Sequence, residues 1–516
     1  MGSHSILDNS SASAFPWVVQ KFGGTSVGKF PDKIARDIVR DYLTRRRVIV
    51  VCSARSTGKK AEGTTSRLLV VFEKLDAISA APCKEESQHA LLYEAKELIQ
   101  AICCDHVLAA QTFVKDETLK TELCKHIEDE CRELIEYIIA AKRFNLEANS
   151  RSKDRIVSIG EKLSCKFMTY LLRDTGVDAE YVDLSDAFRF PQTSRIDTAF
   201  YKAVTTALNA RLADCGDKVP VVTGFFGNVP GSLIDGDIGR GYTDLCSALC
   251  AVATMAEELQ VWKEVDGIFT ADPTKVPTAR LLPSITPSEA AELTFYGSEV
   301  IHHLTMDQVM HADPPIPIRI KNVKNPRGSG TIVLPDIVKS ASQPLQQTNG
   351  YRPSSPGKGE TPKRPTAVTI KDKISVINVH SNKRSLSHGF FARVFSILHA
   401  HHISVDLIST SEVHVSMAIH SPSSEGKVIK QAAEELSECG DVSILHNMAI
   451  LSLVGADMKD MVGIAGKMFS TLGDHNVNLE MISQGASEIN ISCVIEAKDA
   501  TRAMNVLHTH LFTFLE

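Results

Sequence analysis

The stretch VVQKFGGTSVGK, residues 18–29, decides the fold of the chain around it. Its first half, VVQKF, is apolar and β-branched, which predicts a buried strand. Gly23 and Gly24 then let the backbone approach an anion closely, and the amides of a strand-to-helix turn attract phosphate. Thr25 and Ser26 add hydroxyls that suit a helix N-cap. The stretch therefore predicts an anion-binding turn at the carboxyl end of a strand.

Two other interpretations of this turn are weaker. Gly23 to Lys29 nearly fits the P-loop pattern G-x4-G-K, but Phe30 stands where a P-loop needs Ser or Thr to hold its metal. A glycine turn without function would leave the charged Lys21 inside an apolar strand without a partner, which is uncommon.

The rest of the first 335 residues alternates strands with helices. Apolar, β-branched runs predict strands at 47–53, 218–227, 258–265 and 316–323, and helical patterns cover 32–46 and 88–142. Such alternation predicts an α/β fold, a three-layer sandwich around a mostly parallel central sheet. In such folds ligands bind in loops at the carboxyl ends of strands.

Composition sets outer limits on function. At about 150 residues per domain, 516 residues predict three domains. A net charge of −6 and 6% aromatic residues do not suggest a nucleic-acid partner. No uncharged apolar run reaches 18 residues, the start lacks a signal-peptide pattern, and Ile6 breaks the myristoylation pattern. We therefore expect a cytoplasmic protein that does not bind membranes.

The twelve cysteines do not indicate a disulfide framework, because no CxxC occurs and no secretory signal is present. Buried free thiols in a reducing cytosol are the expected state. The eighteen histidines show no zinc-ligand spacing such as HExxH, so we predict no resident metal site.

The last 150 residues contain an internal repeat. FSILHAHHISVDLIS (395–409) aligns with FSTLGDHNVNLEMIS (469–483), and SEVHVSMAI (411–419) aligns with SEINISCVI (487–495). Each copy predicts a helix, a strand, a turn and an alternating strand. Two matched segments in register indicate duplication. A stretch with five prolines and three glycines, residues 340–366, predicts a linker before the repeat.

Three further segments carry chemistry-bearing side chains. VSIGEKLS (157–164) predicts a strand, a turn and a helix that starts at Glu161, whose carboxylate could bind an ammonium group or only favour the helix dipole. TGFFG (223–227) leads to GRGYTD (239–244), where Arg240 suits a carboxylate or phosphate. Asp244 starts an Ala-rich helix, and its alternative role is to cap that helix. WKEVDGIFTADPTKVP (262–277) ends a strand, and its Asp and Pro residues also fit simple turns.

Together and in this order, these motifs resemble the aspartate kinases of the amino-acid kinase superfamily, in their fungal monofunctional form. The resemblance covers residues 17–516, and the C-terminal copies look like ACT regulatory domains of ferredoxin-like α+β fold. It implies a disordered tail (1–15), an amino-acid kinase domain (16–337), a linker (338–366) and two ACT domains (367–445 and 446–516). The two ACT copies are often interlaced in this family, so the final residues are expected to complete the first copy's sheet.

The resemblance implies transfer of the γ-phosphoryl group of MgATP to the side-chain carboxylate of L-aspartate, giving 4-phospho-L-aspartate for threonine, methionine and homoserine biosynthesis. Lys21, Arg240 and Asp244 would be catalytic. The aspartate site would use Ser53, Thr65, Glu161, Phe225, Arg240 and Thr243. The ATP site would use Lys21, Gly23, Gly24, Thr25, Ser26, Lys263, Glu264, Phe269, Thr274 and Lys275, with the Mg²⁺ carried by the nucleotide.

Several positions depart from the bacterial pattern of this family. Lys263 and Glu264 replace Thr-Asp, Phe269 replaces Tyr, and Thr274 stands where Arg is usual. Glu299 occupies the place of a nucleotide-contacting Lys, and the pair His302–His303 is interpreted as structural. These departures weaken the nucleotide contacts and leave the catalytic group intact.

ACT domains resemble small sheets that pair and bind amino acids, which implies a homo-oligomer and feedback inhibition, by threonine first and lysine second. The turns after the matched strands offer hydroxyls and carboxylates to a zwitterion, although any one of these loops could serve only as a dimer contact. The effector candidates are Asn382, Gly389, Asp406, Ser409, Thr410, Ser411, Glu412, Gln484 and Asn490.

Two rival functions stay open at this point. The first is an inactive kinase-like domain that supports an amino-acid sensor. The second is a related kinase acting on glutamate, acetylglutamate or carbamate. The absence of G-x-G-x-x-G excludes a fused homoserine dehydrogenase.

Overall fold

The computed structural model divides the chain into two compact units, Met1–Gly267 with Ile301–Pro335, and Ile268–Val300 with Asp336–Glu516. Within them it describes residues 7–10, 15–58, 62–80, 85–144, 146–185, 187–188, 195–227, 229, 231–236, 238–239, 241–295, 301–334, 364–381, 389–421, 426–485 and 489–512. Most of the predicted linker lies outside the described residues. Over the described residues, no helix combines the length and the apolar character needed to span a bilayer.

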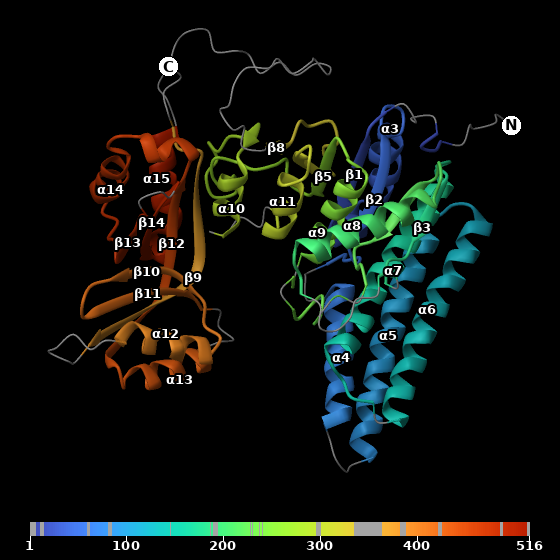
Figure 1. Cartoon of the computed structure of the whole chain (residues 1–516), viewed down its shortest axis with the longest axis horizontal. Helices are drawn as coiled ribbons and strands as arrows, with labels where there is room; N and C mark the ends of the chain where they lie inside the picture. The colour runs from blue at the N-terminus through green and yellow to red at the C-terminus, as the bar shows by residue number, and fades with distance from the viewer. Residues whose placement is uncertain are drawn as a thin grey trace, which may run out of the picture. The chain divides into compact units, whose positions relative to one another are not determined.

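The first unit is built around a sheet in the order β3-β4-β2-β1-β5-β7-β8 (Figure 1). All neighbours pair in parallel except β7 and β8, which are antiparallel. The strands are β1 (Trp17–Phe22), β2 (Arg47–Cys52), β3 (Ala179–Val182), β4 (Val219–Thr223), β5 (Glu258–Lys263), β7 (Ile318–Asn322) and β8 (Thr331–Val333). The predicted parallel α/β sheet and its five strands are confirmed.

Helices cover this sheet on both faces, as its continuous apolar strands require. Val48 and Val50 of β2 join the cluster of η1 and α7, whereas the helix α9 packs on β1, β2 and β5. The helical insertion predicted at 88–142 is confirmed as a long antiparallel pair, α5 and α6, beside α7 (Figure 1). The helices are α1 (Gly24–Lys29), α2 (Pro31–Lys33), the π-helix η1 (Ile34–Val39), α3 (Arg40–Tyr42), α4 (Thr64–Ala80), α5 (Glu85–Phe113), α6 (Glu117–Arg143), α7 (Ser150–Asp174), α8 (Thr198–Ala213), α9 (Tyr242–Ala253) and α11 (His303–Met310).

Two predictions for this unit were wrong. Residues 157–164 form no strand or turn, because they lie inside the 25-residue helix α7. Nearly every α7 side chain from Ile156 to Leu172 is buried, and periodicity alone cannot separate a fully buried helix from a strand. In the predicted tail, residues 7–10 pack on the sheet: Asn9 is fully buried and exchanges hydrogen bonds with the backbone of Val48 at 2.8 and 3.2 Å.

The second unit contains a six-stranded sheet in the order β10-β11-β9-β12-β14-β13 (Figure 1). Its elements are β6 (Ser284–Ile285), α10 (Pro287–Phe295), β9 (Ala367–Ser381), α12 (Phe390–Ala400), β10 (Val405–Thr410), β11 (His414–His420), α13 (Gly426–Leu436), β12 (Gly440–Val454), η3 (Ala456–Asp460), α14 (Ile464–Asp474), β13 (Met481–Ser483), β14 (Asn490–Glu496), η4 (Ala497–Asp499) and α15 (Ala500–Phe512). The order α12-β10-β11 recurs as α14-β13-β14, so the predicted repeat is confirmed.

The two copies share their long central strands. β9 and β12 are 15 residues each and pair in antiparallel fashion from Gly440–Ser381 to Val454–Ala367. One half of β9 pairs with β11 of the first copy, and its other half faces the part of β12 that pairs with β14. The copies are therefore interlaced, but through β9. The chain end was expected to complete the first sheet, and instead α15 packs with β9, β12 and α14.

The segment 268–295, which the sequence analysis placed in the kinase domain, belongs to this second unit. Ala271 and Val276 are buried in the same apolar cluster as Leu451, Met468 and Met504. Thr270 Oγ1 lies 2.8 Å from Nε2 of the buried His508, and the Val368 N–H donates to the Thr270 carbonyl at 2.8 Å. The polar and apolar contacts together fix this segment on the sheet that carries the repeats.

A pair of hydroxyls in the second core gives a test of this packing. Ser452 on β12 and Ser492 on β14 are fully buried, lie opposite each other, and bond at 2.6 Å. Ser452→Ala should destabilise β12–β14 by about 1–3 kcal/mol, because the Ser492 hydroxyl loses its partner. The double variant Ser452→Ala/Ser492→Ala should recover much of that loss. Native-state hydrogen exchange of the β14 amides measures both, and strictly additive losses would contradict the pairing.

Candidate functional site

An ion pair at the carboxyl end of β1 forms the centre of the site. Lys21 is the penultimate residue of β1, and its Nζ lies 2.7 Å from Asp244 Oδ1 in the first turn of α9. The two side chains are only 12% and 16% exposed. Burial alone would raise the pKa of Asp244, but Lys21, followed by Lys263 and His302, lowers it below its usual value. The pair is thus held charged, with the Lys21 ammonium at the strand end.

Glycines bring the neighbouring backbone close to this pair. A Cβ on Gly24 would lie 2.0 Å from the Ala54 carbonyl oxygen, so only glycine lets α1 start so near the end of β2. Gly23 is the N-cap of α1 without a side-chain cap bond. The expected capping by Thr25 or Ser26 was therefore wrong, and the Ser26 hydroxyl donates to Glu264 instead. The first amides of α1 have no acceptor within the helix.

Glu161 lies in the middle of α7, not at a helix start as predicted, and it is 1% exposed. Its Oε1 accepts a 2.7 Å hydrogen bond from the Thr243 hydroxyl. Burial raises the pKa of Glu161 to about 7, and the Thr243 and Tyr242 hydroxyls, the Phe225 backbone and Lys21 limit the rise. The structure thus places Glu161, Thr243 and Phe225 together on the side of the site nearest α7.

Ser53 and Thr65, two further predicted aspartate ligands, lie at the end of β2 and the start of α4. Ser53 follows β2, and its N–H donates to the Phe22 carbonyl at 3.1 Å, while Thr65 is in the first turn of α4. A Cβ on Gly160, next to Glu161, would meet Ala54 Cβ at 2.9 Å and Thr64 Cγ2 at 3.2 Å. Ala54, Thr64 and Gly160 therefore lie close together, and they are the chain neighbours of Ser53, Thr65 and Glu161. Arg240, the remaining predicted aspartate ligand, lies outside the described residues.

The predicted nucleotide residues divide between the two units. Lys21, Gly23, Gly24, Thr25, Ser26, Lys263 and Glu264 belong to the first unit. Phe269, Thr274 and Lys275 belong to the second, where the Lys275 ammonium pairs with Asp372 at 3.3 Å and Thr274 bonds to Asp272. Glu299 lies outside the described residues.

The effector candidates lie in the second unit. Gly389 is the N-cap of α12 with a left-handed φ of 98°. The exposed run from Ser409 to Glu412 covers the last two residues of β10 and the start of the turn to β11. Asp406 on β10 is 7% exposed and pairs with Lys371 at 2.7 Å. Gln484 is exposed after β13, whereas the buried Asn490 donates to Glu292. Asn382 lies outside the described residues.

Three contributors to the site were missed by the sequence analysis. Tyr242 is half-buried, and its hydroxyl hydrogen-bonds Glu161. Asp154 accepts from Ser232 Oγ and from the Leu233 and Ile234 amides, so it fixes the loop that leads towards α9. Gly241, at φ 108°, presses against His302, whose charge also lowers the pKa of Asp244. The motif GRGYTD contains Gly241 and Tyr242, and it was the one sequence signal that could have pointed to them.

No described group of three His, Cys, Asp or Glu side chains is arranged to hold a metal ion. The described cysteines are all free thiols. The site geometry is thus that of a carboxylate and ammonium pair, a glycine turn with free amides, and a second buried carboxylate.

Comparison with known proteins identifies the family of the chain. The model of the amino acid kinase family matches residues 16–322, and an ACT domain model matches residues 451–511. An aspartate kinase of Gibberella moniliformis is 54% identical over 96% of this chain and 98% of its own. Aspartokinases of Schizosaccharomyces pombe and Saccharomyces cerevisiae are each 50% identical, over 96% of this chain and 92% and 93% of theirs.

The fold has a close solved counterpart. Escherichia coli aspartokinase III was solved with aspartate and ADP, and again with lysine and aspartate. These structures give TM-scores of 0.65 and 0.70 at 26% identity, and they cover 96% of this chain and 100% and 99% of that one. The chain is therefore a kinase enzyme that belongs to the amino acid kinase family, in its aspartokinase branch with ACT domains.

Proposed function

We propose that the protein transfers the γ-phosphoryl group of MgATP to the side-chain carboxylate of L-aspartate and forms 4-phospho-L-aspartate. The observation that carries this proposal is the Lys21–Asp244 pair, 2.7 Å apart at the strand end and beside a buried carboxylate suited to an ammonium group. The bound ligands of aspartokinase III, aspartate and ADP, are the substrate and product that this reaction requires. We expect this reaction to be the first step of threonine and methionine biosynthesis.

The chemistry places one main demand on the protein, which is to bring two anions together. The nucleophile is already a carboxylate, so no general base is needed. Two unit charges 4 Å apart repel by about 4 kcal/mol at an effective dielectric near 20. Positioning and charge neutralisation then supply most of the catalysis, as in other phosphoryl transfers.

Lys21 meets that demand in the proposed mechanism. Asp244 fixes its ammonium, so the positive charge lies where the transferred phosphoryl group approaches and no reorganisation is needed during the reaction. The amides of the Gly23–Ser26 turn face the phosphates. We propose that Lys263, Glu264, Phe269, Thr274 and Lys275 bind the rest of the nucleotide.

Glu161 is proposed to bind the ammonium group of aspartate, with Arg240 on its carboxylates. Thr243, Ser53, Thr65 and Phe225 would line the pocket. The Glu161 carboxyl has a pKa of about 7 in the free enzyme. A cation that binds beside it favours the ionised carboxylate. Related substrates such as glutamate, acetylglutamate or carbamate remain the alternative, and a substrate panel separates them from aspartate.

We propose further that the second unit senses threonine and inhibits the enzyme. Asp406 supports this. One oxygen pairs with Lys371, and the other is buried with no hydrogen-bond partner among the described residues, which suits an amino-acid ammonium or hydroxyl. The segment 268–295, proposed to bind nucleotide, is hydrogen-bonded to the same sheet through Thr270 and His508. An effector that binds the inactive state more tightly would thereby affect the nucleotide contacts.

Pairing of chains through this unit is the proposed route to a homo-oligomer. The edge strands β10 and β13 expose Ile408 and Ile482. An exposed apolar edge is a ready site for a second copy.

Lys21→Ala should reduce kcat for ADP release with aspartate by roughly 10²–10³-fold, because the developing phosphoryl charge loses its fixed cation. A coupled assay of ADP release measures the effect. Lys202→Ala, an exposed position on α8, is the matched control and should retain full activity. Unchanged kcat in the folded Lys21→Ala protein would leave an inactive kinase-like sensor as the better account.

The pH dependence should identify Glu161. Its pKa near 7 means that the free enzyme is increasingly protonated below pH 7, and a neutral carboxyl cannot pair with the aspartate ammonium. kcat/KM for aspartate should therefore rise with pH up to about 7 and then level off. Glu161→Gln should remove this limb and raise KM roughly 30-fold or more. A limb that persists in Glu161→Gln would assign the titration to another group.

Threonine should bind the full chain with a saturable heat in calorimetry and inhibit ADP release. Asp406→Asn should weaken both effects roughly tenfold or more, because the buried acceptor charge is lost. Asp441→Asn, exposed on β12, is the matched control and should behave as the original protein. Absence of heat and of inhibition with both threonine and lysine would remove the sensor proposal.

A further inference from the structure

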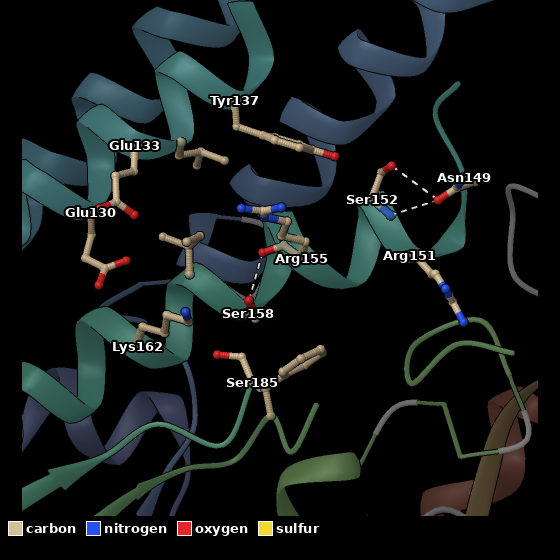
Figure 2. A pocket seen from close by; sticks show the side chains of 13 residues that line it. Glu130, Glu133, Tyr137, Asn149, Arg151, Ser152, Arg155, Ser158, Lys162 and Ser185 are labelled. Atoms are coloured by element: carbon tan, nitrogen blue, oxygen red, sulfur yellow. Dashed lines mark hydrogen bonds between the residues drawn. The ribbon is translucent and has the colours of Figure 1, made fainter. Parts of the chain in front are cut away.

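A polar pocket in the first unit has no role in the mechanism above. It encloses about 460 Å³ between α6 and α7, next to the residues that follow β3 and β4 (Figure 2). Loops at the carboxyl ends of parallel strands are the usual ligand positions in this class of fold. The lining residues that matter here are Glu133 and Tyr137 from α6, Arg155, Ser158 and Lys162 from α7, and Ser185 and Phe225 from the loops.

Some charges around the pocket are already neutralised. Glu130 accepts from the Lys166 ammonium at 2.5 Å, and Lys162 pairs with Asp183 at 3.0 Å. An ammonium group has three donors, and this pairing occupies one of those on Lys162. Lys162 therefore has donors left for a ligand, and Figure 2 shows it directed towards Ser185.

Arg155 and Glu133 are different, because neither has an ion-pair partner within the described residues. The Arg155 guanidinium lies 4.8 Å from the Tyr137 ring centre, which fixes its plane without using its hydrogen-bond donors. Both side chains are exposed and line the pocket, and Figure 2 shows Arg155 beneath Tyr137 and Glu133 beside Glu130. The buried Ser158 hydroxyl donates to the Arg155 carbonyl at 2.8 Å and ties that turn of α7.

We propose that this pocket binds a free acidic amino acid. A guanidinium fork suits one carboxylate, the remaining donors of Lys162 suit a second, and Glu133 suits the ammonium group. A neutral amino acid would leave the remaining Lys162 donors without a second carboxylate, and a dicarboxylate without an amine would offer no cation to Glu133. The charge pattern of the pocket thus matches the class of substrate proposed for the enzyme.

Phe225 links this pocket to the proposed aspartate site. Its side chain lines the pocket, while its backbone lies against Glu161. Ser158 is one helical turn before Glu161 on α7. An acidic amino acid held in the pocket is therefore kept next to the proposed aspartate site, where its local concentration is raised. This role, unlike the binding itself, rests on the proposed function.

Calorimetry on the full chain separates the pocket from the catalytic site. In Glu161→Gln, which disables the proposed catalytic site, L-aspartate should still bind one saturable site. Adding Arg155→Gln should weaken that binding roughly tenfold or more. Arg132→Gln is the matched control, since Arg132 is an exposed α6 arginine outside the pocket. No residual binding in Glu161→Gln, or residual binding that Arg155→Gln leaves unchanged, overturns the proposal.

Ligand selectivity tests the role of Glu133. In the Glu161→Gln background, aspartate should bind more tightly than succinate, which has no ammonium, and than threonine, which has one carboxylate. Glu133→Gln should remove the preference for aspartate over succinate and retain succinate binding, which also shows that the variant is folded. A preference unchanged by Glu133→Gln overturns the proposed ammonium contact and with it the assignment to amino acids.

Kinetics distinguish failure of the pocket from failure of the proposed function. With Glu161 intact, Arg155→Gln should raise KM for aspartate several-fold at low salt, with little change in kcat, and the difference should shrink as salt screens the charges. If the original protein releases no ADP with aspartate but the Arg155-dependent binding is present, the pocket stands and the proposed function falls. If KM does not change although binding is lost, the concentrating role is wrong.

Discussion

The site depends on a single ion pair, Lys21 with Asp244. An ammonium at the end of a buried strand is costly unless a carboxylate and further hydrogen bonds compensate its desolvation. Asp244 supplies the charge from α9, and the low pKa that Lys21 imposes on it keeps the pair ionised. The start of α9 must therefore lie against β1, which the left-handed Gly241 before the helix permits. A kinase that joins two anionic substrates needs such a fixed cation.

Close backbone contacts then determine what surrounds that pair. Gly24 and Gly160 both lie against Ala54, and Gly224 lies against Thr243, where a Cβ would be 2.3 Å from Thr243 Cγ2. These contacts join the ends of β1, β2 and β4 to α7 and α9. As a result Glu161 and Thr243, 82 residues apart, share a 2.7 Å hydrogen bond in a buried setting. The raised pKa of Glu161 follows from that burial.

Two strands that are shared between the repeat copies organise the second unit. β9 and β12 each serve both repeat copies, so neither copy has a complete sheet without the other. The segment 268–295 joins their core through Ala271 and Val276, and through hydrogen bonds of Thr270 and Thr278 to the two ring nitrogens of His508. A predicted nucleotide motif is thus part of the second unit, and a boundary drawn at the Pro-rich linker alone does not describe the compact units.

Local sequence was enough for much of this protein. The apolar, β-branched runs at 18–22 and 47–53 determine strands, the glycine pair determines a turn, and the aligned repeats determine a helix, strand, turn and strand in each copy, because these depend on residues close in the chain. Only the tertiary structure decided that Glu161 lies in mid-helix, that Tyr242 contacts it, and that Arg155 and Glu133 line one pocket between two helices. Burial, pKa and pairing depend on residues far apart in sequence, and no local pattern records which of them come into contact.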